Sequence, residues 1–454
     1  MIEIEFKHRI EQLKMNPAQV LVMGFAVLIL IGATLLNLPI SSIDGKSIGF
    51  IDALFTAASA VCVTGLIVVN TAAHWTLFGK IVILILIQIG GLGFMTMATL
   101  VSFVIGKKIT LKDRLIMQEE LNQFTLSGLV KLTRYIILST IIMEGLGALF
   151  LSSKFIPVYG VKKGIWFSIF HSISAFCNAG FDLIGSSMEP FVESYIVNIT
   201  VTLLVVIGGL GYTVYIDITE SRKYKKFSLH TKLVLIISGG LLLVGFILTL
   251  FLEFNNPDTL GQLTFKGKIL ASMFQSVVPR TAGFNSIDMA SITNATAFII
   301  IIFMFIGGSP GSTAGGIKTT TVGAIVLGVV SVIKGTDDVE VFKKRINNEI
   351  IFRALAVIGI GLSIVVLVTM ILSITEKGTD ATFLDVLFET VSAFATVGLS
   401  RGLTPNLTVI GRLVITVTMF VGRLGPLTMA FAFAKKRREK KGRYRYAEER
   451  IIVG

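Results

Sequence analysis

Four stretches of this chain decide its fold, because each ends in a glycine followed by Leu or Phe and all four align without gaps. They are Ser59-Ala-Val-Cys-Val-Thr-Gly65-Leu66, Ser174-Ala-Phe-Cys-Asn-Ala-Gly180-Phe181, Val277-Val-Pro-Arg-Thr-Ala-Gly283-Phe284 and Ser392-Ala-Phe-Ala-Thr-Val-Gly398-Leu399. Self-similarity spread along a whole chain indicates that one structural unit was duplicated. We call these stretches the glycine segments, and they predict a repeated module.

The similarity extends backwards from each glycine over the length of a short helix. Asp52 and Asp385 lie thirteen residues before their glycines. An aspartate at the start of a helix caps free N–H groups and favours the helix dipole, so we expect both to begin helices. Large apolar residues lie ten residues before the four glycines, where we expect them to pack the short helix: Phe55, Phe170, Met273 and Phe388.

The composition predicts an integral membrane protein. Of the 454 residues, 53% are hydrophobic and 15% are charged, a balance that is rare in a water-soluble domain. A helix needs about 20 apolar residues to cross a hydrocarbon core. Stretches of that length begin near Val20, Phe78, Leu129, Phe191, Thr231, Ala295, Ile350 and Thr408. Shorter apolar segments lie between successive pairs, at 53–64, 165–177, 269–278 and 383–396, and have the length of re-entrant hairpins.

We therefore expect an all-α membrane protein with four tandem helix, pore-loop, helix repeats: eight transmembrane helices and four re-entrant pore loops around a central pore. A second repeated signature supports this division, because glycines recur in the even-numbered spans at 89–93, 207–211, 306–311 and 421–425. Close helix packing is the other explanation for any one such group. The expected parts are a cytoplasmic N-terminus (1–17), pore repeats 18–110, 111–225, 226–340 and 341–434, and a basic cytoplasmic tail (435–454).

The net charge of +13 is concentrated between particular spans. Basic residues precede the first span, lie between the second and third, follow the fourth and sixth, and fill the tail at 435–445. By the positive-inside rule both termini are cytoplasmic. Topology and contact with anionic lipid account for these runs, so no nucleic-acid partner is expected. The four histidines and two cysteines lack ligand spacing, which gives no support for a metal centre or a disulfide. Cys62 and Cys177 are expected to pack behind the pore.

The glycine segments carry the chemistry needed to bind a dehydrated cation. A re-entrant helix that ends in an extended, glycine-bearing turn can direct backbone carbonyls at one axis, and glycine permits the required dihedral angles. Irregular backbone at membrane depth is tolerated where it lines a cavity. Carbonyls without a carboxylate cluster suit a monovalent cation. The predicted ligands are the carbonyls of Val63, Thr64, Gly65, Asn178, Ala179, Gly180, Thr281, Ala282, Gly283, Thr396, Val397 and Gly398.

Two isolated carboxylates lie near these segments or within a span. Asp182 follows Gly180 and could attract cations at the mouth, but a lone charge in a loop is more often solvated. Glu144 lies in the middle of the third span. It could pair with a basic residue or line an interhelical cavity, and the sequence leaves both open.

The VTG, NAG, TAG and TVG loops, together with a broken span in the third repeat, resemble the Trk/Ktr/HKT superfamily of potassium transporters. The similarity covers essentially the whole chain, and 52–65 and 398–405 resemble the membrane subunit of a bacterial Ktr system. The resemblance implies potassium uptake across the bacterial cell membrane, with K+ at the filter carbonyls. It also implies a homodimer with one pore per protomer and a cytosolic ring of regulatory subunits that bind ATP or ADP.

Further expectations come from the same resemblance. Na+ is expected to activate uptake, and no organic cofactor is expected on this chain. A serine in place of the first glycine goes with sodium permeation in the superfamily, so Gly65 implies potassium selectivity. Segment 307–316 cannot continue a regular helix, because Pro310 removes a backbone donor within a run of glycines. It resembles the intramembrane loop that blocks the cytoplasmic side of the filter, although a simple helix break also fits.

The predicted gate residues are Gly307, Gly308, Ser309, Pro310, Gly311, Ser312, Thr313, Ala314, Gly315, Gly316 and Arg423. Arg423 takes the place that a glycine holds in the other three repeats. An unpaired charge at that depth costs at least about 2.5 kcal/mol, so the guanidinium needs a partner. We expect it to face the pore below the filter and to contact segment 307–316.

Three other readings remain. A sodium-permeable or poorly selective transporter would keep the same fold and differ in filter detail. A membrane enzyme, such as a lipid-modifying transferase, usually needs clustered His, Asp or Cys, which the sequence does not show, so the chain is not expected to be an enzyme. A structural or sensor subunit would carry no flux. The basic tail at 435–445 is a candidate to dock a regulatory subunit or anionic lipid, and 451–454 to return to a dimer interface.

Overall fold

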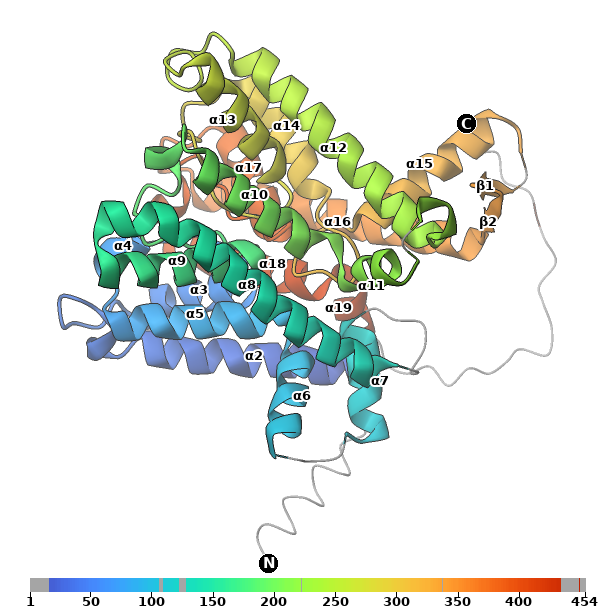
Figure 1. Ribbon diagram of the computed structural model, residues 1–454, viewed down its shortest axis with the longest axis horizontal. Coiled ribbons are helices and arrows are strands. Elements are labelled where there is room, and N and C mark those ends of the chain that lie inside the picture. Colours follow the sequence, from blue (N-terminus) through green and yellow to red (C-terminus); the bar gives the residue numbers. More distant parts are fainter. Residues whose placement is uncertain are drawn as a thin grey trace, which may run out of the picture.

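The computed structural model describes residues 16–105, 109–121, 128–221, 223–336, 338–433 and 449. These residues are predominantly helical, which confirms the prediction of an all-α protein (Figure 1). Among them, four long helices are continuous and apolar enough to cross a membrane. They are α2 (Pro17–Leu36), α8 (Leu129–Tyr159), α12 (Leu229–Glu253) and α16 (Asn348–Thr375).

Three of the even-numbered spans are bent pairs of helices instead of continuous ones. These pairs are α5 (Leu77–Leu92) with α6 (Phe94–Ile105), α10 (Tyr195–Leu210) with α11 (Tyr212–Ser221), and α18 (Val409–Leu424) with α19 (Pro426–Phe433). Their bends measure 101°, 92° and 95°. Each break falls at a glycine with positive φ, namely Gly93, Gly211 and Gly425, a conformation that few other residues adopt.

The remaining even-numbered span is interrupted more widely. Helix α14 (Asn294–Phe305) and helix α15 (Thr319–Ile333) are separated by the irregular residues 306–318. Ile306 and Ile317 form a parallel bridge across the base of this excursion, so the chain leaves the helix and returns to it nearby.

A short helix precedes each glycine segment: α3 (Phe50–Val61), α9 (Val161–Phe176), α13 (Phe265–Val277) and α17 (Phe383–Phe394). Helix α13 ends earlier than the others relative to its glycine, because Pro279 lacks the N–H that would continue the helix. In this third repeat, the residue that packs the short helix is also different from the one expected. Phe274 is buried there, and Met273 is only partly buried, whereas the phenylalanines expected in the other three repeats are fully buried.

Each short helix and the spans on either side of it in the sequence form one group, which gives four groups in chain order. Contacts between successive groups run around a closed ring. Helix α5 contacts α9, α10 contacts α13, α14 contacts α17, and α18 returns to contact α3. The last contact joins parts of the chain that the sequence places far apart. Its outer end carries an ion pair between Arg412 and Asp52, with 2.5 Å between nitrogen and oxygen. At the other end, Asn16 and Gln19 donate to the carbonyls of Phe431 and Ala432 in α19.

The two aspartates predicted to cap short helices differ in what they do. Asp385 completes a capping box in which Thr382 begins α17, with 2.9 Å between Thr382 N and Asp385 Oδ2. Asp52 lies in the first turn of α3, but the helix begins at Gly49 without a side-chain cap. The Asp52 carboxylate binds Arg412 instead, so its prediction as a cap is wrong.

Buried carboxylates at the ends of two long helices hold the starts of the helices that follow. Glu376 accepts hydrogen bonds from Thr408 N and Oγ1, at 2.8 and 2.7 Å, where α18 begins. Glu253 does the same for Thr293 at the start of α14, at 2.9 and 2.8 Å. These contacts repeat between the third and fourth groups of helices.

The remaining elements are α4 (Thr71–His74), α7 (Leu111–Glu120), η1 (Pro39–Ser41), η2 (Glu189–Phe191), η3 (Tyr224–Lys226) and η4 (Thr404–Asn406). Strands β1 (Val339–Val341) and β2 (Lys344–Ile346) form a hairpin that the sequence did not predict. The boundary expected between the third and fourth repeats, at residues 340 and 341, falls inside β1.

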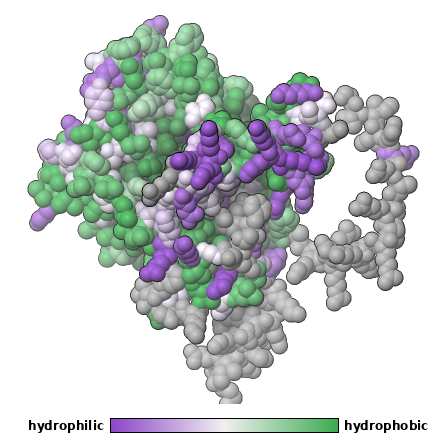
Figure 2. All heavy atoms as spheres, turned by 45° about the vertical axis from the view of Figure 1, so that its right-hand side comes forward, coloured by the Kyte–Doolittle hydropathy of each residue, from purple (hydrophilic) through white to green (hydrophobic). Residues whose placement is uncertain are grey.

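In Figure 2 hydrophobic residues cover much of the face, and hydrophilic residues gather toward the side where α15 and the hairpin lie. Exposed basic residues there include Lys334, Lys343, Lys344 and Arg345.

Candidate functional site

The four glycine segments share an unusual backbone. Two residues before each glycine, a residue with a side chain adopts a positive φ, which is uncommon outside glycine. These residues are Val63 (55°), Asn178 (59°), Thr281 (70°) and Thr396 (52°), and the glycines Gly65, Gly180, Gly283 and Gly398 have φ of 95°, 69°, 72° and 90°. The same strained turn therefore occurs four times at the same position of the repeat.

Serines at the first position of three glycine segments hold this backbone in place. Ser59 Oγ accepts from the N–H of Gly65 and Ser392 Oγ accepts from that of Gly398, both at 3.1 Å. Ser174 Oγ instead donates to the Phe181 carbonyl at 2.8 Å. Reasoning from sequence missed this role, although the repeated serine was visible. The third segment has Val277 at this position, and there Ala282 N donates to the Val278 carbonyl at 3.0 Å.

The four glycines follow four different short helices and meet at one place. A methyl group built on any of them would crowd the backbone of another glycine segment: Gly65 against Ala179 O (2.5 Å), Gly180 against Gly283 Cα (2.7 Å), Gly283 against Val397 O (2.7 Å), and Gly398 against Thr64 O. The structure thus brings all four predicted triplets together. The residues of these triplets that carry side chains are buried.

The chemistry of this place is that of backbone oxygen atoms. Within the described residues, no group of three or more His, Cys, Asp or Glu side chains could hold a metal ion. Carbonyl groups converging on one point offer partial negative charge without a fixed charge, which favours weak binding and release of a monovalent cation. No protein nucleophile or acid–base pair is part of the arrangement.

Asp182 is not the solvated loop residue that the sequence favoured. Its side chain is buried, and Oδ1 accepts hydrogen bonds from the backbone N–H groups of Ile184 and Gly185. An aspartate that bonds to the backbone two and three residues ahead stabilises a tight turn. Asp182 therefore shapes the chain that follows the second glycine segment.

Segment 307–316 packs directly against the glycine segments. Thr313 Oγ1 donates to the Phe176 carbonyl at 3.2 Å, within the second glycine segment and just before its triplet. A methyl group on Gly316 would lie 3.3 Å from the carbonyl oxygen of Ala395, just before the fourth glycine triplet. The segment also bonds to the break in the second bent pair, because Ser309 N donates to Gly209 O at 2.9 Å and Tyr212 N donates to Gly311 O at 2.9 Å.

Arg423 lies against segment 307–316 and against the break between α5 and α6. Its guanidinium donates to the carbonyls of Thr313, Gly90 and Gly91. The partner that the sequence required is therefore a set of carbonyls from two elements. Lys318, which follows the segment, is a second cation here, and its Nζ donates to the Ala314 carbonyl at 2.6 Å. Sequence reasoning gave Lys318 no role beside the gate, although its charge next to the glycine-rich break was a signal.

The structure identifies the partner of Glu144, which the sequence left open. Gln88 Nε2 of α5 donates to Glu144 Oε1 at 3.0 Å, so the partner is an amide. Ser172 Oγ of α9 donates to the Glu144 backbone carbonyl at 2.6 Å. The thiol of Cys177 lies next to this pair, 3.9 Å from Glu144 Oε1. Cys62 and Cys177 are both free and buried.

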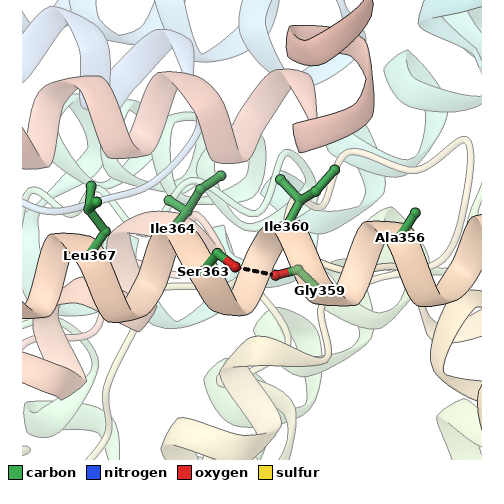
Figure 3. Close-up of a pocket in the computed structure, with 6 residues that line it drawn as sticks. All are labelled: Ala356, Gly359, Ile360, Ser363, Ile364 and Leu367. Atoms are coloured by element: carbon green, nitrogen blue, oxygen red, sulfur yellow. Dashed lines mark hydrogen bonds between the residues drawn. The ribbon is translucent and has the colours of Figure 1, made fainter. Parts of the chain in front are cut away.

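A hollow elsewhere on the molecule is separate from these groups. It runs along one face of α16 and is lined by Ala356, Gly359, Ile360, Ser363, Ile364 and Leu367 (Figure 3). Ser363 Oγ donates to the Gly359 carbonyl within the same helix at 2.8 Å. Its lining is almost entirely apolar and includes none of the predicted filter or gate residues. The predictions for residues 1–15, 435–445 and 451–454 concern parts of the chain outside the described residues.

Comparison with known proteins gives a consistent result along the whole chain. Residues 4–442 match the family model TrkH, described as a cation transport protein. The Ktr system potassium uptake protein B of Bacillus subtilis is 46% identical over 447 residues, covering 98% of each chain. The potassium/sodium uptake protein NtpJ of Enterococcus hirae is 44% identical and covers 97% of this chain and 98% of its own length.

A solved structure supports the fold independently. The potassium transporter TrkH from Vibrio parahaemolyticus superimposes with a TM-score of 0.71, covering 92% of this chain and 84% of the other at 20% sequence identity. At that identity the match concerns the fold alone. The family model and the full-length relatives, together with the repeated glycine turns, establish that this chain belongs to the TrkH family of cation transport proteins, which are multi-pass membrane proteins.

Proposed function

We propose that this chain is the ion-translocating subunit of a Ktr-type potassium uptake system, and that the four glycine segments form its selectivity filter. One observation carries the proposal: each filter glycine crowds the backbone of another glycine segment, so four turns surround one point. A cation there would exchange its hydration shell for the carbonyls of the four triplets. The four repeats proposed to build the pore are 18–110, 111–225, 226–340 and 341–434.

Segment 307–316 acts as the gate on the cytoplasmic side of the filter in this proposal. Its contacts within the second and fourth glycine segments support that role, because a segment held there would block a path that runs between the four triplets. Arg423 holds the gate through Thr313 and places a positive charge beside the path of a cation. Movement of the segment away from the filter opens the pathway.

The named relatives support potassium as the main cargo and suggest one alternative. The Bacillus subtilis relative is named for potassium uptake, and the Enterococcus hirae relative for both potassium and sodium. A sodium-permeable or poorly selective transporter is therefore the second candidate. Four glycines in the filter favour potassium, because a side chain at any of them would displace a carbonyl. Sodium as an activator of potassium uptake is part of the same proposal.

The proposed assembly is a homodimer in the bacterial cell membrane with both termini in the cytoplasm. A cytosolic ring of subunits that bind ATP or ADP controls the gate. The relative's name describes a system, which is consistent with a separate regulatory component. The exposed basic residues near β1 and β2 lie on the side that the positive-inside rule places in the cytoplasm.

The test is ion flux into liposomes that contain the purified chain, comparing potassium with sodium. Gly65→Ser is expected to admit sodium. A Cβ atom at position 65 would lie 2.5 Å from the carbonyl oxygen of Ala179, so that carbonyl would have to move. Gly402→Ser is a matched control: Gly402 has the same φ of 95° as Gly65, but nothing lies within 4 Å of an added Cβ. Equal selectivity of Gly65→Ser and wild type would refute the filter.

A further inference from the structure

A carboxylate from α7 holds the broken end of another helix. Glu120 is the last residue of α7, and its two oxygens accept hydrogen bonds from the backbone N–H of Met95 at 3.0 and 3.1 Å. Oε2 also accepts from Thr96 N at 3.2 Å. Both N–H groups belong to the first turn of α6, which begins immediately after the break at Gly93. Glu120 is therefore a helix cap supplied from a different element.

The break between α5 and α6 leaves two helix ends facing each other. The end of α5 presents carbonyls with partial negative charge, and the start of α6 presents N–H groups with partial positive charge. Arg423 binds the first set at Gly90 and Gly91, and Glu120 binds the second. Each charge has the sign that its helix end favours.

The Glu120 carboxylate packs closely against the backbone of the break. A methyl group on Gly93 would lie 2.8 Å from Glu120 Cδ, so the carboxylate fits against bare backbone. The same guanidinium that binds the end of α5 also binds the Thr313 carbonyl in the gate segment. Hydrogen bonds therefore join α7 to the start of α6 on one side of the break, and the end of α5 to the proposed gate on the other, with only residues 92–94 of the backbone between them.

We propose that Glu120 is a positioning residue of the gate, which passes the position of α7 to Arg423 and segment 307–316. This inference rests on the proposed function of that segment. Helix α7 carries several charged residues, including Asp113, Arg114 and Glu119, and its capping box at Thr110 gives it a defined start. It contacts α2, α6 and α8, so it connects the first group of helices, including the helix that begins at the break, to the second.

Hydrogen exchange of the purified full-length chain tests the proposal without relying on flux. Glu120→Gln keeps the volume beside Gly93 and removes the charge and one acceptor, and Glu119→Gln is the matched control on the exposed neighbour. We expect Glu120→Gln to speed exchange about fivefold in 94–100, the usual effect of losing one helix cap. Exchange in 307–319 is expected to rise as well. A purely local cap would change 94–100 alone, and that result would overturn the proposal.

Potassium flux in liposomes provides the second arm. Glu120→Gln is expected to raise basal flux about fivefold, because it weakens the arrangement in which Arg423 holds the gate. In an Arg423→Met background the same substitution should add nothing, since its effect passes through the guanidinium. Additive effects, or lower flux in Glu120→Gln, would overturn the proposal. Absence of wild-type flux would instead count against the proposed function, and the exchange of 307–319 would still decide the role of Glu120.

Discussion

Substitution of Arg423 should unlock the proposed gate by an amount that follows from its contacts. The guanidinium makes three hydrogen bonds, but only the one to Thr313 reaches segment 307–316. Loss of that bond therefore sets the change in the balance between closed and open states. A hydrogen bond from a charged donor contributes about 1.5–3 kcal/mol. This corresponds to an increase of about tenfold to about 150-fold in the ratio of open to closed states.

Two substitutions separate the hydrogen bonds of Arg423 from its charge. Arg423→Met keeps an unbranched side chain and removes both, so it should give the full increase in potassium flux into liposomes. Arg423→Lys keeps the charge but lacks the planar fork that reaches three carbonyls, so its flux should lie between wild type and Arg423→Met. Arg353→Met, an exposed arginine in α16, serves as the control. Unchanged flux in Arg423→Met would refute this reasoning.

Three further predictions concern stability and the filter. Ser59→Ala leaves a buried filter N–H without its acceptor, which should cost about 1–3 kcal/mol and lower potassium-over-sodium selectivity; intact selectivity in the flux assay would contradict this. Asp52→Asn and Arg412→Gln should show a coupling of about 1 kcal/mol in thermal unfolding in detergent, reduced by salt, because the pair is about a fifth exposed; additive effects would refute the pairing. Glu376→Gln should speed hydrogen exchange at the start of α18, where Thr408 loses an acceptor, and equal exchange would rule out this role for Glu376.

The sequence predicts the short helices and their glycine turns well, because both repeat. A pattern that recurs four times identifies equivalent positions, so the triplets ending in Gly65, Gly180, Gly283 and Gly398 could be aligned before their proximity was known. Pro310 and its neighbouring glycines likewise located the irregular segment between α14 and α15. The function of these residues as filter and gate stays a prediction.

Other features depend on contacts between distant parts of the chain, which periodicity does not report. The bends at Gly93, Gly211 and Gly425 were not predicted, because a glycine in an apolar run also suits a continuous helix. Asp52 was expected to cap its own helix, but Arg412 of the fourth group competes for it. Glu120 lies in a polar stretch whose pattern says nothing about the backbone it meets.

The ring in which α18 returns to contact α3 is made from one polypeptide. Assembly from four identical chains would force every substitution to appear at four equivalent places. Tandem duplication removes that constraint, so a single arginine can stand at Arg423 where three equivalent positions keep glycine. It also lets the third quarter carry the wide irregular segment 306–318, where the other three have a short break at one glycine. Departure from fourfold symmetry is thus encoded in the sequence. The proposed pathway can therefore have four similar glycine turns at the filter and a gate that comes from one repeat alone.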